Sequence, residues 1–270
     1  MKPQGATPIN GPGAGGGRFE GKTVIVTGGA GGMGAAAATA FADEGARVAI
    51  LDISTEAGDQ RVASIRNAGG TAEFFELNLA CTGEIERVID RVSSTFGPAD
   101  VLFNHAGIVA VAPFIDTTIE QFDAVFNVNL RASFVVCKRV VRDMVANGGG
   151  SIVISSSIGA SHAFQFESVY CMTKAAVLML AKSIAVEYRE FGIRANAICP
   201  GFVRTAHGLR EIELFHALGQ TWDESAFQAT QIRMCEPEEV ARAVLFLASG
   251  EASFINGAGL YIDNGWAVKG

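Results

Sequence analysis

Short apolar segments alternate with longer segments of helical periodicity along most of this chain, from Lys22 to the C-terminus. The short segments are rich in β-branched residues and are apolar on both faces, a pattern typical of parallel strands that helices cover on both sides. They predict strands over Thr23–Thr27, Arg47–Asp52, Ala72–Leu77, Val101–Asn104, Ser151–Ser155, Arg194–Ile198 and Leu260–Asp263.

Between these strands, apolar positions recur with the period of an α-helix. They predict helices over Met33–Asp43, Thr55–Asn67, Thr82–Phe96, Thr118–Ala146, Ser168–Glu190 and Pro237–Ala248. Because strand and helix alternate, we expect an α/β fold: a single-domain, doubly wound parallel sheet of Rossmann type with helices on both faces. Such sheets bind ligands beyond the carboxyl ends of their strands, so the residues directly after each strand matter most for function.

The composition indicates one globular unit with a tail. Residues 1–17 are rich in Gly and Pro and lack a hydrophobic period, which predicts a flexible tail there and one domain over 18–270. Of the 270 residues, 49% are hydrophobic, so the chain can bury a sizeable core.

Charge and cysteine content argue against several classes of partner. The formal net charge of −7 disfavours nucleic acid, since phosphate binding needs a concentrated positive surface. No apolar run approaches the roughly 20 residues that cross a bilayer, and no signal peptide is apparent, so we expect no membrane partner. The five cysteines are widely spaced, without a CxxC pair or a histidine partner, which predicts reduced thiols and no metal site. We therefore expect a cytoplasmic protein that acts on a small molecule.

A glycine-rich segment follows the first predicted strand and opens the first predicted helix. It reads Thr27-Gly28-Gly-Ala-Gly-Gly32-Met33-Gly34 and contains the pattern GxGxxG. At such a turn, backbone N–H groups at the helix N-terminus can bind a pyrophosphate, and glycine removes the Cβ atoms that would block its approach. The segment therefore predicts a dinucleotide site.

The end of the second predicted strand indicates which dinucleotide binds. Asp52 lies 18 residues after Gly34, where a carboxylate accepts hydrogen bonds from both ribose hydroxyls and repels a 2′-phosphate. Ile53 follows it, and the segment from Thr27 to Gly34 holds no Arg or Lys that could bind that phosphate. NAD is therefore favoured over NADP.

Tyr170 and Lys174 form a Tyr-x-x-x-Lys pair on a predicted helix, so they share one helix face. A free tyrosine has a pKa of about 10 and is a poor base near neutrality, but a neighbouring ammonium stabilises its phenolate. Tyr170 can then exchange a proton with a substrate oxygen. The run Ser155-Ser156-Ser157 follows a strand at the ligand-binding edge and offers three hydroxyls that could orient the same oxygen.

Further motifs follow the order of a known family. They are Asn104-His105-Ala106-Gly107, Val128-Asn129-Leu130, Pro200-Gly201-Phe202-Val203-Arg204-Thr205 and Ile262-Asp263-Asn264-Gly265. With the glycine-rich segment and the Tyr–Lys pair, they make the chain resemble the short-chain dehydrogenase/reductase family from Phe19 to the C-terminus. His105 departs from the family pattern, which has a second Asn there.

The resemblance implies four catalytic residues: Asn129, Ser157, Tyr170 and Lys174. Ser157 is selected from the serine run because the family serine lies thirteen positions before the tyrosine. By resemblance, Ser157 orients the substrate oxygen, Tyr170 transfers the proton and Lys174 holds the ribose and tunes Tyr170. Asn129 shapes the long helix and completes the proton relay.

The same motifs imply the cofactor-binding residues: Gly28, Gly32, Met33, Gly34, Asp52, Ile53, Asn78, Leu79, Asn104, Ala106, Gly107, Tyr170, Lys174, Pro200, Gly201, Val203 and Thr205. Asn78-Leu79 departs from the Asp-Val that the family often has beside the adenine, although an amide can still accept from the adenine amino group. Val203 would contribute backbone groups and Thr205 a hydroxyl to the nicotinamide carboxamide.

The resulting hypothesis is an NAD-dependent oxidoreductase that moves a hydride between nicotinamide and a secondary alcohol or ketone. Residues 206–234 occupy the position of the family's substrate lid, and their apolar content favours a hydrophobic or ring-bearing substrate, although the same spacing fits a mere packing face. The alternatives are a 3-oxoacyl-thioester reductase, disfavoured by Asp52, and a non-catalytic dinucleotide-binding sensor or scaffold. The apolar helix face over Val169–Ala185 is compatible with a homo-oligomer, either a tetramer or a dimer.

Overall fold

The computed structural model describes residues 17–269, and most of the predicted tail, residues 1–16, lies outside this range. The strands form one sheet in the order β3-β2-β1-β4-β5-β6-β7, and every neighbouring pair is parallel. The strands are β1 Thr23–Thr27, β2 Arg47–Asp52, β3 Thr71–Glu76, β4 Val101–Asn104, β5 Gly150–Ser155, β6 Ile193–Pro200 and β7 Gly259–Ile262. The predicted doubly wound parallel sheet is confirmed.

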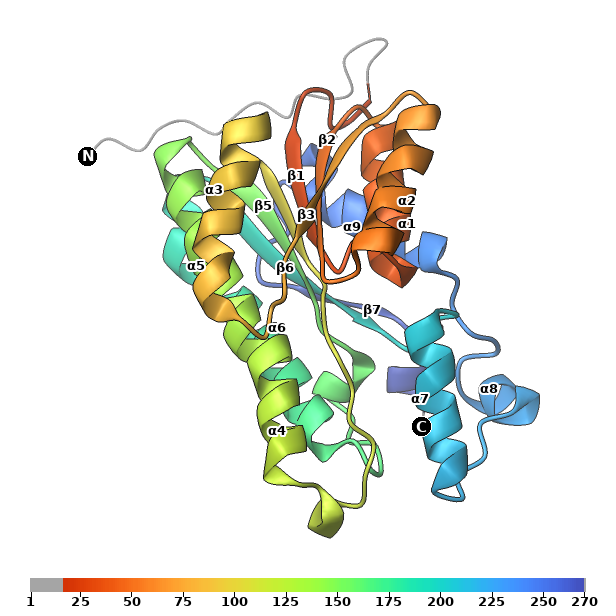
Figure 1. The fold of residues 1–270 in the computed structure, drawn as a ribbon. Helices are drawn as coiled ribbons and strands as arrows, with labels where there is room; N and C mark the ends of the chain where they lie inside the picture. Colours follow the sequence, from red (N-terminus) through yellow and green to blue (C-terminus); the bar gives the residue numbers. More distant parts are fainter. Residues whose placement is uncertain (1–16, 270) are drawn as a thin grey trace.

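Helices cover both faces of the sheet (Figure 1). On one face lie α1 Gly32–Asp43, α2 Thr55–Asn67 and α9 Pro237–Ala248; on the other lie α3 Ile85–Phe96, α5 Ser133–Ala146 and α6 Ser168–Tyr188. Successive side chains of one strand point to opposite faces of the sheet. Val24 and Val26 pack with α1 and α9, whereas Ile25 packs with the helices of the other face. This explains why the central positions of strands such as β1 and β2 are apolar on both faces.

The helix predicted over Thr118–Ala146 is confirmed as one continuous helical stretch over residues 119–146, but the prediction missed a π-helical segment within it. Helix α4, Ile119–Phe126, is followed by a π-helical segment, Asn127–Ala132, and then by α5. Within the π-helical segment, the Asn129 side chain bonds both backbone groups of Ile108. Hydropathy cannot reveal this wider turn, because the apolar period continues through it.

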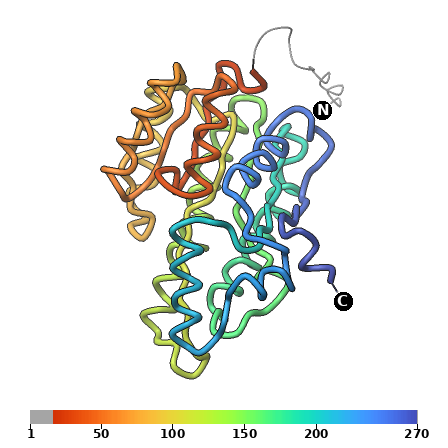
Figure 2. Tube along the Cα trace, turned by 90° about the vertical axis from the view of Figure 1, so that its right-hand side faces the viewer, coloured from red at the N-terminus to blue at the C-terminus, as the bar shows by residue number. Residues whose placement is uncertain are grey.

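Residues 206–234, for which the sequence predicted no helix, contain two helices. These are α7, Ala206–Ala217, and α8, Glu224–Thr230, capped by the side chains of Thr205 and Asp223. In both views α4 and α7 extend beyond the same edge of the sheet. This is the edge at the carboxyl ends of the strands (Figures 1 and 2).

The apolar residues of this lid segment mostly pack against one another. Phe215, Trp222 and Phe227 cluster around Phe202, with ring centroids 4.7 to 6.4 Å from that of Phe202. Their spacing therefore reflects a small separate core, the packing face that the sequence left as an alternative. This core joins the segment to Phe202, just after the end of β6.

Helix α6 and the turn after it, Ser168–Phe191, form one helical stretch of mean hydropathy 1.5 that is long and apolar enough to cross a bilayer. The sequence prediction that no apolar run approaches this length overlooked it, because Lys174 and Lys182 interrupt the run. The helix packs on β5 and β6 and buries Val177 and Ala181 in the core. A helix that packs in a protein core can be equally long and apolar. These two properties are therefore weak evidence for a membrane span.

Candidate active site

Two adjoining cavities open at the carboxyl ends of the strands. The larger, about 1430 Å³ including space open to solvent, lies where the strand order reverses between β1 and β4, the point at which doubly wound sheets bind ligands. The predicted cofactor residues that line it are Gly28, Gly32, Met33, Asp52, Ile53, Asn78, Leu79, Ala106, Gly107, Tyr170, Lys174 and Thr205. The smaller, about 550 Å³, is lined by Pro200, Gly201 and Val203 among others. The predicted residues Gly34 and Asn104 are buried and line neither of these cavities.

The glycine turn between β1 and α1 needs glycine for two separate reasons. Gly28 and Gly32 have φ values of +67° and +53°, a region that side chains with a Cβ adopt at a cost. At Gly34, a Cβ atom would lie 2.0 Å from the carbonyl oxygen of Gly28. The turn is therefore compact, and it brings the free N–H groups of the first turn of α1 to the cleft wall, which fits a pyrophosphate.

The Thr27 hydroxyl holds the neighbouring loop after β4 against this turn. It accepts hydrogen bonds from the backbone N–H groups of His105 at 2.9 Å and Ala106 at 3.1 Å, and it bonds the Asn104 side chain at 3.3 Å. Thr27 and Asn104 are both buried. The cleft wall formed by residues 104–107 is thus fixed by one buried hydroxyl at the end of β1.

Asp52 lies at the end of β2, on the wall of the larger cavity. Its Oδ2 accepts from the N–H of Ala30 and its Oδ1 from that of Ser54, both at 3.1 Å. These bonds orient the carboxylate toward the cleft and leave further lone pairs on both oxygens. Among the described residues that line this cavity, Lys174 at the opposite end is the one Lys or Arg, so no cation lies beside Asp52. The geometry fits a ribose with two free hydroxyls.

Beyond Asp52 the cleft wall is formed by Asn78 and Leu79. The Asn78 Oδ1 accepts the N–H of Ala80 at 3.0 Å, which shapes the loop after β3 and leaves one lone pair of that oxygen free. Ile53 is 63% exposed at the cleft rim. An apolar rim with a single amide suits the flat, weakly polar face of an adenine.

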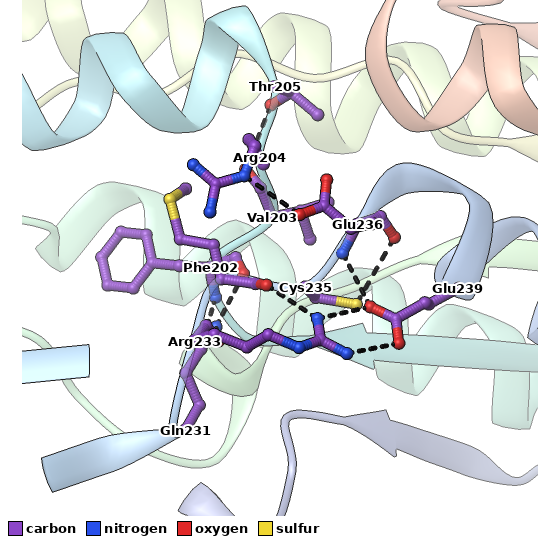
Figure 3. A network of polar contacts seen from close by, with 10 residues as sticks. Phe202, Val203, Arg204, Thr205, Gln231, Arg233, Cys235, Glu236 and Glu239 are labelled. Carbon is purple, nitrogen blue, oxygen red and sulfur yellow. Dashed lines mark hydrogen bonds and ion pairs between the residues drawn. The ribbon is translucent and has the colours of Figure 1, made fainter. Parts of the chain in front are cut away.

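At the other end of the cleft, the segment after β6 is held by a polar network (Figure 3). The Gln231 side chain bonds both backbone groups of Phe202, and the Cys235 backbone bonds those of Phe202 and Arg204. Arg233 and Glu239 form a double ion pair behind this contact. The network fixes the segment that carries Val203 and Thr205.

Thr205 closes the gap between this segment and the glycine turn. Its hydroxyl accepts from the N–H of Gly208 at 3.0 Å and so caps α7, and its methyl group lies against Gly32. Both ends of the larger cavity are therefore built from backbone that is held by hydrogen bonds. The residues present fit a bound dinucleotide along the whole cleft.

Ser157, Tyr170 and Lys174 converge between the two cavities. Ser157 and Tyr170 line the smaller cavity, Tyr170 and Lys174 the larger, and the Lys174 Nζ lies 5.4 Å from the centre of the Tyr170 ring. Burial, followed by the charges of Glu211 and Glu167, raises the pKa of the Tyr170 hydroxyl well above its usual value. Burial lowers the pKa of Lys174 to about 8.

The structure distinguishes the three serines. The Ser155 hydroxyl bonds the His105 Nδ1 at 2.9 Å, while that of Ser156 donates to the Lys174 carbonyl at 2.8 Å. The Ser157 hydroxyl accepts from the N–H of Gly159 at 3.0 Å, so its own hydrogen stays available to a ligand in the smaller cavity. The Lys174 ammonium donates to the Ser155 carbonyl at 2.9 Å and is thereby aimed at the larger cavity.

Asn129 connects the loop after β4 with α6. It is 2% exposed; its Oδ1 accepts from the Ile108 N–H, and its Nδ2 donates to the Ile108 carbonyl and to the Thr173 hydroxyl. A Cβ on Gly107 would lie 3.2 Å from the Asn129 Oδ1 and 3.4 Å from the Lys174 Nζ. Asn129 therefore lies behind Lys174 and positions the cleft wall; its part in a proton relay stays a prediction.

Comparison with known proteins identifies the family. Residues 28–267 match the family model described as enoyl-(acyl carrier protein) reductase. The chain is 35% identical to D-threitol dehydrogenase of Mycolicibacterium smegmatis, over 93% of this chain and 95% of the relative. It is 35% identical to cyclopentanol dehydrogenase of a Comamonas species, over 94% and 100%. It is 36% identical to a 3-oxoacyl-[acyl-carrier-protein] reductase of Thermotoga maritima, over 93% and 100%. The chain belongs to the short-chain dehydrogenase/reductase family.

Solved structures of this family superpose closely. Levodione reductase matches with a TM-score of 0.90 at 30% identity, over 93% of this chain and 100% of that chain. An NAD⁺-bound xylitol dehydrogenase matches with a TM-score of 0.88 at 30% identity, over 92% and 99%. A structure from Beutenbergia cavernae with NADP at low occupancy matches at 0.84 with 32% identity, over 94% and 100%. The family binds a nicotinamide dinucleotide, and neighbours of this chain hold either form.

The sequence motifs did not reveal two features of this active site. One is the contact of His105 with Ser155 and the stacking of its ring on Phe103, with centroids 5.1 Å apart. The other is a group of acidic residues beside Tyr170, Glu167 and Glu211, which line the smaller cavity. Glu167 precedes Tyr170 by three positions and is the N-cap residue of the helix that carries it, a proximity that could have indicated it, whereas Glu211 comes from the distant α7.

Proposed function

We propose that this short-chain dehydrogenase/reductase oxidises secondary alcohols, or reduces the corresponding ketones, with NAD. The observation that carries the proposal is the convergence of Ser157, Tyr170 and Lys174 at the junction of a dinucleotide-sized cleft and a smaller cavity. The relatives named for threitol, cyclopentanol and xylitol support an alcohol as substrate. Asp52, without a neighbouring cation in the cleft, supports NAD over NADP.

The proposed chemistry rests on the positions of these side chains. The Ser157 hydroxyl donates to the substrate oxygen, and the Tyr170 hydroxyl exchanges a proton with that oxygen. Because burial keeps Tyr170 a phenol in this structure, proton transfer needs added positive charge nearby. Lys174 supplies part of that charge and binds the ribose through its remaining N–H groups. A bound nicotinamide supplies or accepts the hydride.

The 3-oxoacyl-thioester reductase remains the alternative that one relative supports. Two observations favour an alcohol dehydrogenase. Asp52 lies at the ribose position and repels the 2′-phosphate of NADP. The described residues of the smaller cavity include no Lys or Arg, whereas a phosphopantetheine-borne substrate would bring negative charge there. A non-catalytic sensor would have no use for three proton-handling groups at the cavity junction.

A panel of secondary alcohols, assayed with NAD and with NADP through the absorbance of reduced nicotinamide, tests the proposal. We expect turnover of several alcohols with NAD and a higher kcat/KM with NAD than with NADP. Faster reduction of a 3-oxoacyl thioester with NADPH would favour the alternative, and dinucleotide binding without turnover of either substrate class would favour a sensor.

We also propose that the protein associates with copies of itself through the outer face of α6. Met172, Met179 and Val186 recur at heptad spacing on this helix and are 54%, 58% and 66% exposed, and Phe134 on α5 is 51% exposed. Light scattering on the wild type and on Met179→Lys tests this: we expect a dimer or tetramer that dissociates in the variant, whereas a monomeric wild type refutes it.

A further inference from the structure

The smaller cavity beside Tyr170 is lined by two chemically different groups of side chains. Phe164, Phe202 and Trp266 form an apolar part, which suits the carbon skeleton of a substrate. Glu167, His207 and Glu211 form a polar part, and nothing in the transfer of a hydride and a proton by Ser157, Tyr170 and Lys174 requires them. A purely hydrophobic substrate would leave this polar part without a partner.

The two carboxyl groups meet inside the cavity wall. Glu167 is the N-cap residue of α6, and Glu211 lies on α7. Burial, followed by the charge of Glu211, raises the pKa of Glu167, and burial also raises that of Glu211. Because each carboxylate disfavours a negative charge on the other, the pair favours one shared proton over two ionised groups. The pair thus holds one proton and one negative charge.

The pair has free acceptor capacity inside the protein. Glu167 is 2% exposed, and apart from the proton shared with Glu211, no hydrogen-bond donor among the described residues reaches its buried Oε1. The His207 Nε2 lies 3.7 Å from the Glu211 Oε2, but burial lowers the pKa of His207 to about 4, so this imidazole is neutral at pH 7. A buried carboxyl pair that shares one proton still has acceptor lone pairs without a donor, which is costly and indicates a missing partner.

An unfavourable backbone conformation precedes Glu167 and holds it in this position. Phe166, directly before it, has a φ of +68°, which is unfavourable for a residue with a large side chain. Its carbonyl accepts the N–H of Ala112 at 2.9 Å, and its ring joins the aromatic cluster around Phe202. The turn is therefore fixed from two sides, and it aims Glu167 into the cavity rather than into solvent.

We propose that Glu167 and Glu211 bind a second hydroxyl group of the substrate, so that this enzyme prefers neutral polyols, above all vicinal diols, over simple alcohols. This inference rests on the proposed alcohol dehydrogenase activity. The second hydroxyl donates to the carboxyl pair while the reacting hydroxyl contacts Ser157 and Tyr170. Both carboxyls are specificity-determining residues, and neither takes part in hydride or proton transfer.

The charge balance around the cavity favours a neutral hydroxyl over an ionised group. The Lys174 ammonium lies close enough to Glu211 to lower the pKa of that carboxyl, so the single negative charge of the pair already has a counter-charge. A substrate ammonium would add an uncompensated positive charge beside Lys174, and a substrate carboxylate would be repelled by the pair. A hydroxyl supplies the missing donor without changing the net charge.

The test compares three probes that share one ring: vicinal cyclohexanediol, cyclohexanol and vicinal aminocyclohexanol. The values of kcat and KM are measured with NAD for the wild type, Glu167→Leu and Glu211→Leu, and for Glu167→Gln and Glu211→Gln in case a leucine variant does not fold. Glu213→Gln is the matched control, because Glu213 lies two positions from Glu211 on the same helix and is exposed.

We expect the wild type to prefer the diol over cyclohexanol by ~10-fold or more in kcat/KM, mainly through KM, as for a hydrogen bond to a charged group. The leucine variants lose this preference but retain turnover of cyclohexanol, and Glu213→Gln keeps it. Three results would overturn this inference alone. The wild type could use the diol and cyclohexanol equally well, the leucine variants could keep the preference for the diol, or the wild type could prefer the amino alcohol. Absence of turnover with every alcohol overturns the proposed function as well.

Discussion

Cofactor choice offers the sharpest quantitative prediction, because it depends on one carboxylate whose surroundings are simple. The perturbation is Asp52→Ser combined with Ile53→Arg. Asp52 is half-buried at the cleft wall, with its two oxygens oriented by Ala30 and Ser54. Removing it deletes charge-assisted hydrogen bonds to the ribose, each typically ~1.5–3 kcal/mol, which weakens NAD binding.

The same change removes repulsion of a 2′-phosphate. Two unit charges 4 Å apart interact by ~1 kcal/mol in bulk water and ~4 kcal/mol near a protein surface, and the half-buried Asp52 lies between these limits. The arginine adds a fork-shaped donor at the rim position that Ile53 now occupies. Together these terms predict that the ratio of kcat/KM for NAD to that for NADP falls by ~10²-fold or more.

The assay is initial-rate kinetics with both dinucleotides, accompanied by calorimetric dissociation constants that do not depend on turnover. Asp59→Ala serves as the control, since Asp59 is an exposed carboxylate on α2. We expect the control to leave the ratio unchanged. A wild type that works better with NADP, or a double variant that keeps its preference for NAD, would refute the assignment of Asp52.

Three further predictions concern the site and its supports. Ser157→Ala should lower turnover by ~10²-fold or more through loss of a donor to the substrate oxygen, and Ser155→Ala far less; a larger loss in Ser155→Ala, seen in the same rate assay, would contradict the strand register. Gly34→Ala should weaken NAD binding and lower Tm, because its Cβ would lie 2.0 Å from the Gly28 carbonyl oxygen; calorimetry showing wild-type affinity would contradict the described turn. Because the folded-state pKa of Glu167 is raised, the folded protein binds more protons than the unfolded chain above pH 4.5, so stability should fall toward pH 9 and fall less in Glu167→Gln. Parallel Tm profiles of the two proteins would contradict the buried pair.

The fold and the cofactor cleft could be predicted from the sequence because their signals are local. Most strands are short apolar runs, Gly28 and Gly34 follow the end of the first strand, and Asp52 ends the second. The parallel sheet then brings these strand ends to one edge, so a linear motif becomes a three-dimensional site without further information.

The features that the sequence did not reveal depend on contacts between distant segments. The π-helical segment around Asn129 is set by two hydrogen bonds to the Ile108 backbone, not by hydropathy. The pairing of Glu167 with Glu211 requires that α7 and the start of α6 meet at the same cavity. The aromatic residues of 206–234 predict an apolar surface equally well whether they face a substrate or, as here, mostly one another.

The central claim is that Tyr170 transfers the proton in an NAD-dependent reaction. Its most direct test is Tyr170→Phe, which keeps the ring and removes the exchangeable hydrogen, with Tyr188→Phe on the same helix as the control. Turnover of the best alcohol from the panel is measured beside the dissociation constant for NAD. We predict a loss of ~10²-fold or more in kcat with unchanged NAD affinity in Tyr170→Phe, and no loss in the control. Near-normal turnover in Tyr170→Phe would contradict the account.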